Sequence, residues 1–332
     1  MAVAQSFGVL NYSGMLFNKG NTRTPLSTMI GGRRMVTNHV EFAVGQYYTG
    51  GGSGSQPAIS ETASLTAPSP SSATRTQMTN VTQIFQESFG VSYAKMSNMG
   101  TLSGLNVASQ TANPTSELDF QAAVKMQKIA RDIEYTFING AYNKATTDAT
   151  INKTRGLVTA ITTNVTAMSS AALGVWDVAE MAQKIYGQNA PTDGLVVWCD
   201  ATTRMQLNAD AVANGLTIAP ASREVNGLNL SSIVTPFGLV YIYTGECLPS
   251  GTAMLLNLDV IKPVEQLVPG KGNFFMEELS KAGAGTTYQI FGQIGLDHGP
   301  EWYHGKWTGL ATTFTKPAGK SIYVANAADI GA

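Results

Sequence analysis

Residues 113–143 read NPTSELDFQAAVKMQKIARDIEYTFINGAYN, the one long stretch of the chain with the periodicity of a helix. Its apolar residues recur every three or four positions, which places them on one side of a helix. That stripe consists of Leu118, Ala122, Met126, Ile129, Ile133 and Phe137. Asn113 and Pro114 suit a helix start, and Gly140 suits its end. The pattern predicts a helix over 114–139, about 39 Å long at about 1.5 Å per residue. A rod of this length indicates an elongated module, and the alternative is an ordinary core helix of an enzyme domain.

The composition favours a protein that assembles. The chain has 332 residues, of which 43% are hydrophobic and only 13% are charged. Average soluble domains carry about 25% charged residues, and charge keeps exposed surface in solution. The net charge of −1 argues against a protein that binds nucleic acid chiefly through a basic face. Neither a secretory leader nor a membrane-spanning stretch of about 18 apolar residues is predicted.

The first 40 residues form a weakly basic segment. They contain Lys19, Arg23, Arg33 and Arg34 and no acidic residue. Up to about residue 28 no helical or strand period fits, which predicts an extended arm ordered by what it lies against. Its positive charge is consistent either with a solvated terminus or with contacts to phosphate.

Two alternating segments enclose a low-complexity region. The alternation predicts one strand over 35–44 and a returning strand over 78–93, which together make a long antiparallel hairpin. Residues 49–77 between them consist almost wholly of Gly, Ser, Thr, Ala and Pro. A two-stranded hairpin is at best marginally stable alone, so we expect it to rest on a neighbouring subunit. The alternative is a flexible linker.

The second half of the chain has a mixed α/β pattern without a regular βαβ repeat. Helices are predicted over 175–188, with Trp176, Ala179, Ala182, Ile185 and Tyr186 on one face, and over 201–213. Short strands are predicted over 195–199, 225–233, 238–243, 253–258, 288–296 and 304–314. The fold class is therefore α+β.

Local signatures of catalysis or metal binding are missing from the sequence. His298, Glu301 and His304 resemble a metal-binding set, but Gly299 and Pro300 break the helix that would align them. The glycine-rich run at 50–54 lacks the Lys-Ser/Thr of a phosphate-binding loop. Cys199 and Cys247 match no metal-binding spacing and are predicted to be reduced thiols. No cofactor is expected, and an enzyme or ligand-binding protein survives only as an alternative with an unmarked pocket.

The order of these parts resembles the major capsid proteins of tailed bacteriophages, which have the HK97-type fold. The resemblance covers nearly the whole chain, and it rests on the order and spacing of short motifs. They are Thr24-Pro25-Leu26-Ser27-Thr28-Met29-Ile30, Asn80-Val81-Thr82-Gln83-Ile84-Phe85, Asp132-Ile133-Glu134, Arg155-Gly156-Leu157, Thr235-Pro236-Phe237-Gly238, His304-Gly305 and Thr308-Gly309-Leu310.

The resemblance implies a division of the chain into five parts. These are an N-terminal arm (1–35), an extended loop (36–90), a peripheral domain (91–155) with helix 114–139 as its spine, an axial domain (156–285), and returning strands of the peripheral domain with a C-terminal tail (286–332). Candidate contacts between subunits, or with the inner surface, are Arg23, Arg33, Arg34, Lys125, Lys128 and Arg131. The charged face of the spine helix is expected to be free for such contacts.

The implied function is a major capsid protein that assembles from hexamers and pentamers into an icosahedral or prolate shell around double-stranded DNA, and not an enzyme. Implied partners are other copies of the chain, a portal, and separate scaffolding or decoration proteins, with no membrane. Assembly would take place in the cytoplasm of the host bacterium, and the product would be the virion capsid. Residues 45–94 contain no lysine, so a cross-link from a loop lysine is not expected.

Overall fold

A computed structural model describes residues 23–49, 54, 56–70, 72–94, 117–213, 231–281 and 283–314. Its helices are α1 (Pro25–Ile30), α2 (Glu61–Ser64), α4 (Glu117–Asn139), α5 (Leu157–Ala160), α6 (Val175–Gly187) and α7 (Ala201–Ala213), with short 3-10 turns η1 (Gly31–Arg33), η2 (Leu258–Val260) and η3 (Glu301–Tyr303). Its strands are β1 (Met35–Thr37), β2 (Glu41–Thr49), β3 (Thr74–Val81), β4 (Gln83–Ser92), β5 (Val165–Ala167), β6 (Leu195–Cys199), β7 (Ser232–Thr235), β8 (Gly238–Thr244), β9 (Ala253–Leu256), β10 (Lys262–Gln266), β11 (Phe275–Glu278), β12 (Gly285–Asp297) and β13 (Gly305–Thr308).

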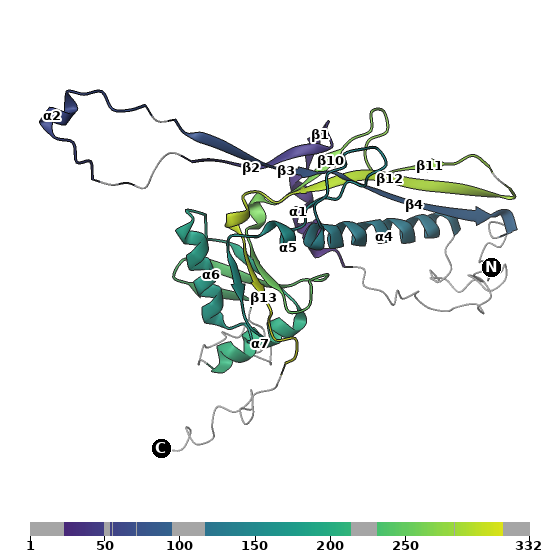
Figure 1. Ribbon diagram of the computed structural model, residues 1–332. Coiled ribbons are helices and arrows are strands. Elements are labelled where there is room, and N and C mark those ends of the chain that lie inside the picture. Colours follow the sequence, from purple (N-terminus) through teal and green to yellow (C-terminus); the bar gives the residue numbers. More distant parts are fainter. Residues whose placement is uncertain are drawn as a thin grey trace, which may run out of the picture.

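The long helix α4 lies along a five-stranded sheet (Figure 1). Strand β12 is at the centre of this sheet and pairs antiparallel with β4, β10 and β11, while β1 adds to β10 in parallel. Ile129, Ile133 and Phe137 of α4 are buried, as the periodicity predicts. Leu118 and Ala122 pack against the same core, whereas Met126 is 41% exposed. The described part of the helix ends at Asn139, in agreement with the predicted end.

Strands β2 and β3 form a separate two-stranded hairpin that projects from the body and carries α2 near its tip (Figure 1). From here on the name extended loop refers to residues 41–81, a shorter range than the predicted 36–90, because β1 and β4 belong to the five-stranded sheet. The prediction that residues 78–93 form one strand of this hairpin is wrong in part, because the chain changes sheets at Thr82. The Thr82 amide donates to the carbonyl of Val40 (2.8 Å) and its hydroxyl bonds Gln266 (2.7 Å). Strand β4 then pairs with β12 along its length.

The second sheet has six strands in the order β5-β13-β9-β6-β8-β7. All five residues of β6 are buried, because both faces of the sheet are covered. One face packs on α6 and α7, and the other joins the core beneath α4 and α5. The predicted buried face of α6 is partly wrong. Val178, Met181, Ala182 and Ile185 are its buried residues, whereas Trp176 and Tyr186 are exposed.

The expected domain boundary at residue 285 does not separate the two sheets. Strands β10 and β11 fall within 156–285 but belong to the five-stranded sheet beside α4. Strand β13 falls within 286–332 but lies inside the six-stranded sheet, between β5 and β9. The reason is that the chain leaves the six-stranded sheet after β9 and returns only with β13. Sequence order therefore does not follow spatial order here.

Several expectations lie outside the described residues. They are the arm up to residue 22, the proposed helix start at 113–116, part of the strand at 225–233, and the tail from 315.

Candidate functional site

Short motifs that are far apart in the sequence meet where the extended loop joins the body. Asn80 of β3 is fully buried at this junction, where it contacts the end of β12 and the segment before α5. Its amide donates to the carbonyls of Leu296 (2.7 Å) and Arg155 (3.2 Å). Its oxygen accepts from the amides of Arg155 (2.8 Å) and Val81 (2.9 Å). A buried amide with all these groups satisfied fixes its neighbours firmly, so Asn80 sets the position of the loop base.

A buried carboxylate anchors the segment that precedes the extended loop. Glu134 of α4 is 0% exposed and accepts hydrogen bonds from the amides of Leu26 and Ser27, both at 2.8 Å. The Ser27 hydroxyl donates to the same carboxylate at 2.5 Å. These amides belong to the first turn of α1, which has no partner for them within the helix. Glu134 therefore fastens α1 to the C-terminal part of the long helix.

Two glycines bring the end of α4 against the segment before α5. A Cβ atom added to Gly156 would lie 2.4 Å from the Gly140 nitrogen, and one added to Gly140 would lie 2.4 Å from the Thr154 carbonyl oxygen. Such distances are far below van der Waals contact. Only glycine fits at both positions, which explains the Arg155-Gly156-Leu157 motif.

The three arginines that precede the loop form ion pairs within the subunit. Arg23 lies 3.7 Å from Glu246, Arg33 lies 2.6 Å from Asp259, and Arg34 lies 3.4 Å from Glu265. Asp259 lies on 3-10 turn η2, and Glu265 lies on strand β10 of the five-stranded sheet. These two ion pairs therefore hold the start of the described chain to β10 and to the turn before it. Their guanidinium groups are partly exposed, and contacts with another subunit stay a prediction.

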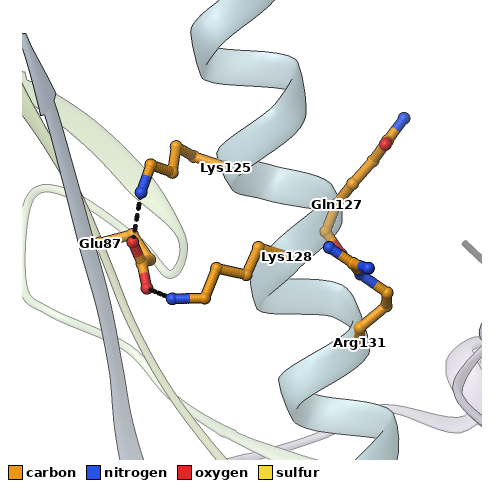
Figure 2. A network of polar contacts seen from close by, with 5 residues as sticks. All are labelled: Glu87, Lys125, Gln127, Lys128 and Arg131. Atoms are coloured by element: carbon orange, nitrogen blue, oxygen red, sulfur yellow. Dashed lines mark hydrogen bonds and ion pairs between the residues drawn. The ribbon is translucent and has the colours of Figure 1, made fainter. Parts of the chain in front are cut away.

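Figure 2 shows that the basic residues of α4 point in two directions. Lys125 and Lys128 reach β4 and bind Glu87, with a Lys125–Glu87 distance of 2.8 Å. Hydrogen bonds from Lys125 and then Lys128 hold the pKa of Glu87 below its usual value. Gln127 and Arg131 project away from β4 (Figure 2). The expectation of a free charged face is therefore wrong for Lys125 and Lys128, because a carboxylate on the neighbouring strand pairs with both.

The extended loop exposes apolar side chains that its own subunit leaves uncovered. Tyr48 is 73% exposed, and Ile59 and Leu65, which flank α2, are 72% and 84% exposed. A cavity of about 620 Å³ lies at the base of the loop, lined by Val40, Glu41, Val81, Ile84 and residues 144–152. Exposed apolar groups close to a projecting tip are typical of a surface that another molecule covers.

The residues of the rejected metal set have separate structural roles. Glu301 accepts hydrogen bonds from the amides of Thr162 (2.9 Å) and Thr163 (3.0 Å). His304 accepts from the amide of Asn257 (3.1 Å) and donates to the carbonyl of His298 (2.8 Å). Within the described residues no cluster of His, Cys, Asp or Glu has the geometry of a metal site, and Cys199 and Cys247 are free thiols. Across those same residues, none of the helices combines the length and apolar character needed to span a bilayer.

The buried groups Asn80, Glu134 and Glu301 could not be recognised individually from the sequence. The signal was indirect, since Glu134 and the Thr24–Ile30 segment both belong to the motifs of the capsid resemblance. The structure explains their joint occurrence, because Glu134 binds the amides of Leu26 and Ser27.

Comparisons with known proteins agree with this architecture. The capsid asymmetric unit of cyanophage A-1(L) superposes with a TM-score of 0.66 at 10% identity, covering 91% of this chain and 96% of that one. The structure of Mycobacterium phage Che8 superposes with a TM-score of 0.53 at 12% identity, covering 92% of this chain and 98% of that one. The SrpI encapsulin of Synechococcus elongatus PCC 7942 superposes with a TM-score of 0.54 at 9% identity, covering 86% of this chain and 88% of that one. These similarities identify the fold as HK97-type.

Sequence comparison identifies the family. None of the curated proteins matches the chain. The family model described as SU10 major capsid protein matches residues 2–311. The alternative of an enzyme or ligand-binding protein gains no support, and the family implies a structural role. The chain belongs to the SU10 major capsid protein family and is a shell-forming component of a bacteriophage capsid.

Proposed function

We propose that the subunit assembles by resting its extended loop on an adjacent copy. The observation that carries this proposal is the composition and exposure of the loop itself. Strands β2 and β3 pair only with each other over their described length. A two-stranded hairpin of this kind is marginal in water, and its exposed Tyr48, Ile59 and Leu65 would be covered by a neighbour.

Repetition of this contact would build the shell. One face of a subunit would meet a different face of the next, and such heterologous contacts close into rings. The proposed rings contain six or five copies, and together they form an icosahedral or prolate shell around double-stranded DNA. Many modest contacts held at once would make it durable without a single strong bond. We place assembly in the cytoplasm of the host, with a portal and separate scaffolding or decoration proteins as partners.

The proposed domain division follows the sheets. The peripheral domain would contain α4 and the five-stranded sheet, and the axial domain would contain the six-stranded sheet with α6 and α7. The six basic residues are proposed contacts between subunits or with the inner surface. Lys125 and Lys128 share the single carboxylate of Glu87, which cancels one of their two positive charges and so reduces the charge that they would offer to DNA. A near-neutral lining would leave packaged DNA mobile, since each neutralised phosphate adds attraction.

Shortening the extended loop tests the proposal. Thr49 pairs with Thr74, so deletion of residues 51–72 leaves Gly50 and Ala73 as a two-residue connection, the length that favours a tight hairpin. We expect a folded subunit, by circular dichroism, that fails to form shells by electron microscopy and sedimentation. Ile59→Asp with Leu65→Asp should act similarly, whereas Ile59→Leu with Leu65→Ile keeps the apolar surface and should assemble. Normal particles from the deletion would show that the loop is only a linker.

A further inference from the structure

Two buried histidines lie where the chain crosses from one sheet to the other. Residues 298–304 connect β12 of the five-stranded sheet to β13 of the six-stranded sheet. His298 and His304 are both 0% exposed on this crossover. Asn164, from the segment before β5, donates to the carbonyls of Trp302 (2.8 Å) and His304 (3.0 Å), so the crossover is held to the six-stranded sheet at several points.

The contacts of His304 require a neutral ring. Its Nδ1 accepts the amide hydrogen of Asn257, and its Nε2 faces the carbonyl oxygen of His298, which can only accept. The neutral ring with hydrogen on Nε2 satisfies both contacts. A second proton on Nδ1 would point at the Asn257 amide hydrogen and break that bond.

The contacts of His298 lead to the same conclusion. Its Nδ1 lies 2.8 Å from the carbonyl oxygen of Gly299 and must donate to it. Its Nε2 is then the unprotonated nitrogen, and it is buried without a hydrogen-bond partner. Protonation there would create a buried N–H group with nothing to accept it, which is costly.

The crossover also touches the base of the extended loop. A Cβ added to Gly45, at the bulge in β2, would lie 3.3 Å from the backbone of Gly299 and Pro300. The ring of Tyr47 meets that of Trp302 edge to face at 5.2 Å. Movement of the crossover would therefore change the support of the loop where β2 bends.

We propose that His298 and His304 form an acid-released latch, in which protonation opens the crossover and frees the base of the extended loop. The latch is a property of the single subunit. Only its consequence for the shell, a loosened loop contact, rests on the proposed function.

The surrounding charges define the pH range. Burial is the main cause that lowers the pKa of His298 and of His304 to about 4 from an ordinary value of 6.5. Arg155 and the other histidine disfavour protonation of His298, whereas Glu301 favours protonation of both rings. Within the part of the chain that the structure describes, further charged groups at the crossover are Asp297, Lys262 and Lys306. Burial raises the pKa of Asp297 and lowers that of Lys306.

The direction of the pH dependence follows from the number of protons that each form binds. Well above pH 6.5 both rings are neutral whether the crossover is open or closed. Between pH 6.5 and 4 the open form binds protons that the closed form excludes, so acid favours opening. At pH 5 the opening equilibrium should increase by up to about 30-fold for each histidine relative to pH 8.

Hydrogen exchange of the full-length, unassembled chain tests the latch, so that a failure to form shells does not affect the result. After correction for intrinsic exchange rates, peptides covering 297–308 should lose protection between pH 6.5 and 5, while those within 129–138 of α4 should not. His298→Asn keeps a donor toward Gly299, and His304→Gln keeps a donor toward His298. Both changes should reduce the pH dependence. His39→Asn alters an exposed histidine and should behave as the parent.

Two results would overturn the proposal. One is acid-induced opening that persists unchanged in His298→Asn and His304→Gln, and the other is opening that disappears in Asp297→Asn alone. If the histidine variants do not fold, hydrogen exchange of the unaltered chain still tests the proposal. Constant protection of residues 297–308 from exchange between pH 6.5 and 5 would contradict the latch.

Discussion

Replacing Glu134 with Gln should release α1 from the long helix. The carboxylate accepts two backbone amides and one hydroxyl in a fully buried position. A glutamine keeps one acceptor oxygen but turns an NH₂ group toward a second donor. Leaving one buried amide without an acceptor costs about 1–3 kcal/mol. The local opening equilibrium of α1 should therefore increase about 5- to 150-fold.

Exchange of the Leu26 and Ser27 amides measures this opening directly, and denaturant unfolding measures the effect on the whole subunit. Glu134→Ala removes both acceptors and should cost more than Glu134→Gln. Glu180→Gln is the matched control, because the Glu180 side chain is 60% exposed and pairs with Lys184 on the surface of α6. Surface pairs of this kind contribute about 0–1 kcal/mol. Equal exchange rates at Leu26 and Ser27 in Glu134→Gln and Glu180→Gln would refute the anchoring role.

Three further predictions concern the close glycine contact and two charged residues of α4. Gly156→Ala should destabilise the subunit by about 3 kcal/mol in thermal or chemical denaturation, because its Cβ would overlap the Gly140 backbone, whereas Gly187→Ala meets no neighbour and should be near neutral. An equal effect of the two changes would contradict this reasoning. Lys128→Glu should lower subunit stability slightly in chemical denaturation, because the new carboxylate replaces an ion pair with repulsion of Glu87. Arg131→Glu should leave folding intact and reduce the yield of particles or the amount of DNA that they protect from nuclease. An unchanged yield and unchanged protection would show that Arg131 contacts neither another subunit nor DNA.

Periodicity predicted the long helix well because a single stripe of residues meets a single core. Ile129, Ile133 and Phe137 are buried as that stripe requires. The same reasoning missed the change of sheet at Thr82. Apolar residues keep one parity at Val81, Phe85 and Phe89, although β3 and β4 pair with different strands. The burial of Asn80 and Thr82 on either side of Val81 marks the change of sheet, but it is not visible in the apolar pattern. A period of two identifies the buried face of a strand and carries no information about its partner.

Polar contacts between residues far apart in the chain could not be predicted from the sequence either. The spacing of Lys125 and Lys128 places both on adjacent turns of one helix, but it does not reveal that Glu87 of β4 lies within reach of both. Helical spacing groups Trp176 and Tyr186 on one face of α6 with Ala182 and Ile185, yet Trp176 and Tyr186 are exposed. Exposed aromatic residues are consistent with a surface that another subunit covers in an assembly. Such residues are exposed in the single subunit, because its own core does not cover them.

The strand order has a consequence for synthesis of the protein. The five-stranded sheet lacks its central strand until β12 is made, and the six-stranded sheet lacks an internal strand until β13 is made. Both strands come from residues 285–308. A nascent chain that does not yet contain these residues therefore has neither sheet complete, and pairing over such sequence separations is slow. Subunits should become competent to join one another only once residues 285–308 have been made and paired, which would keep partly made copies out of a growing particle.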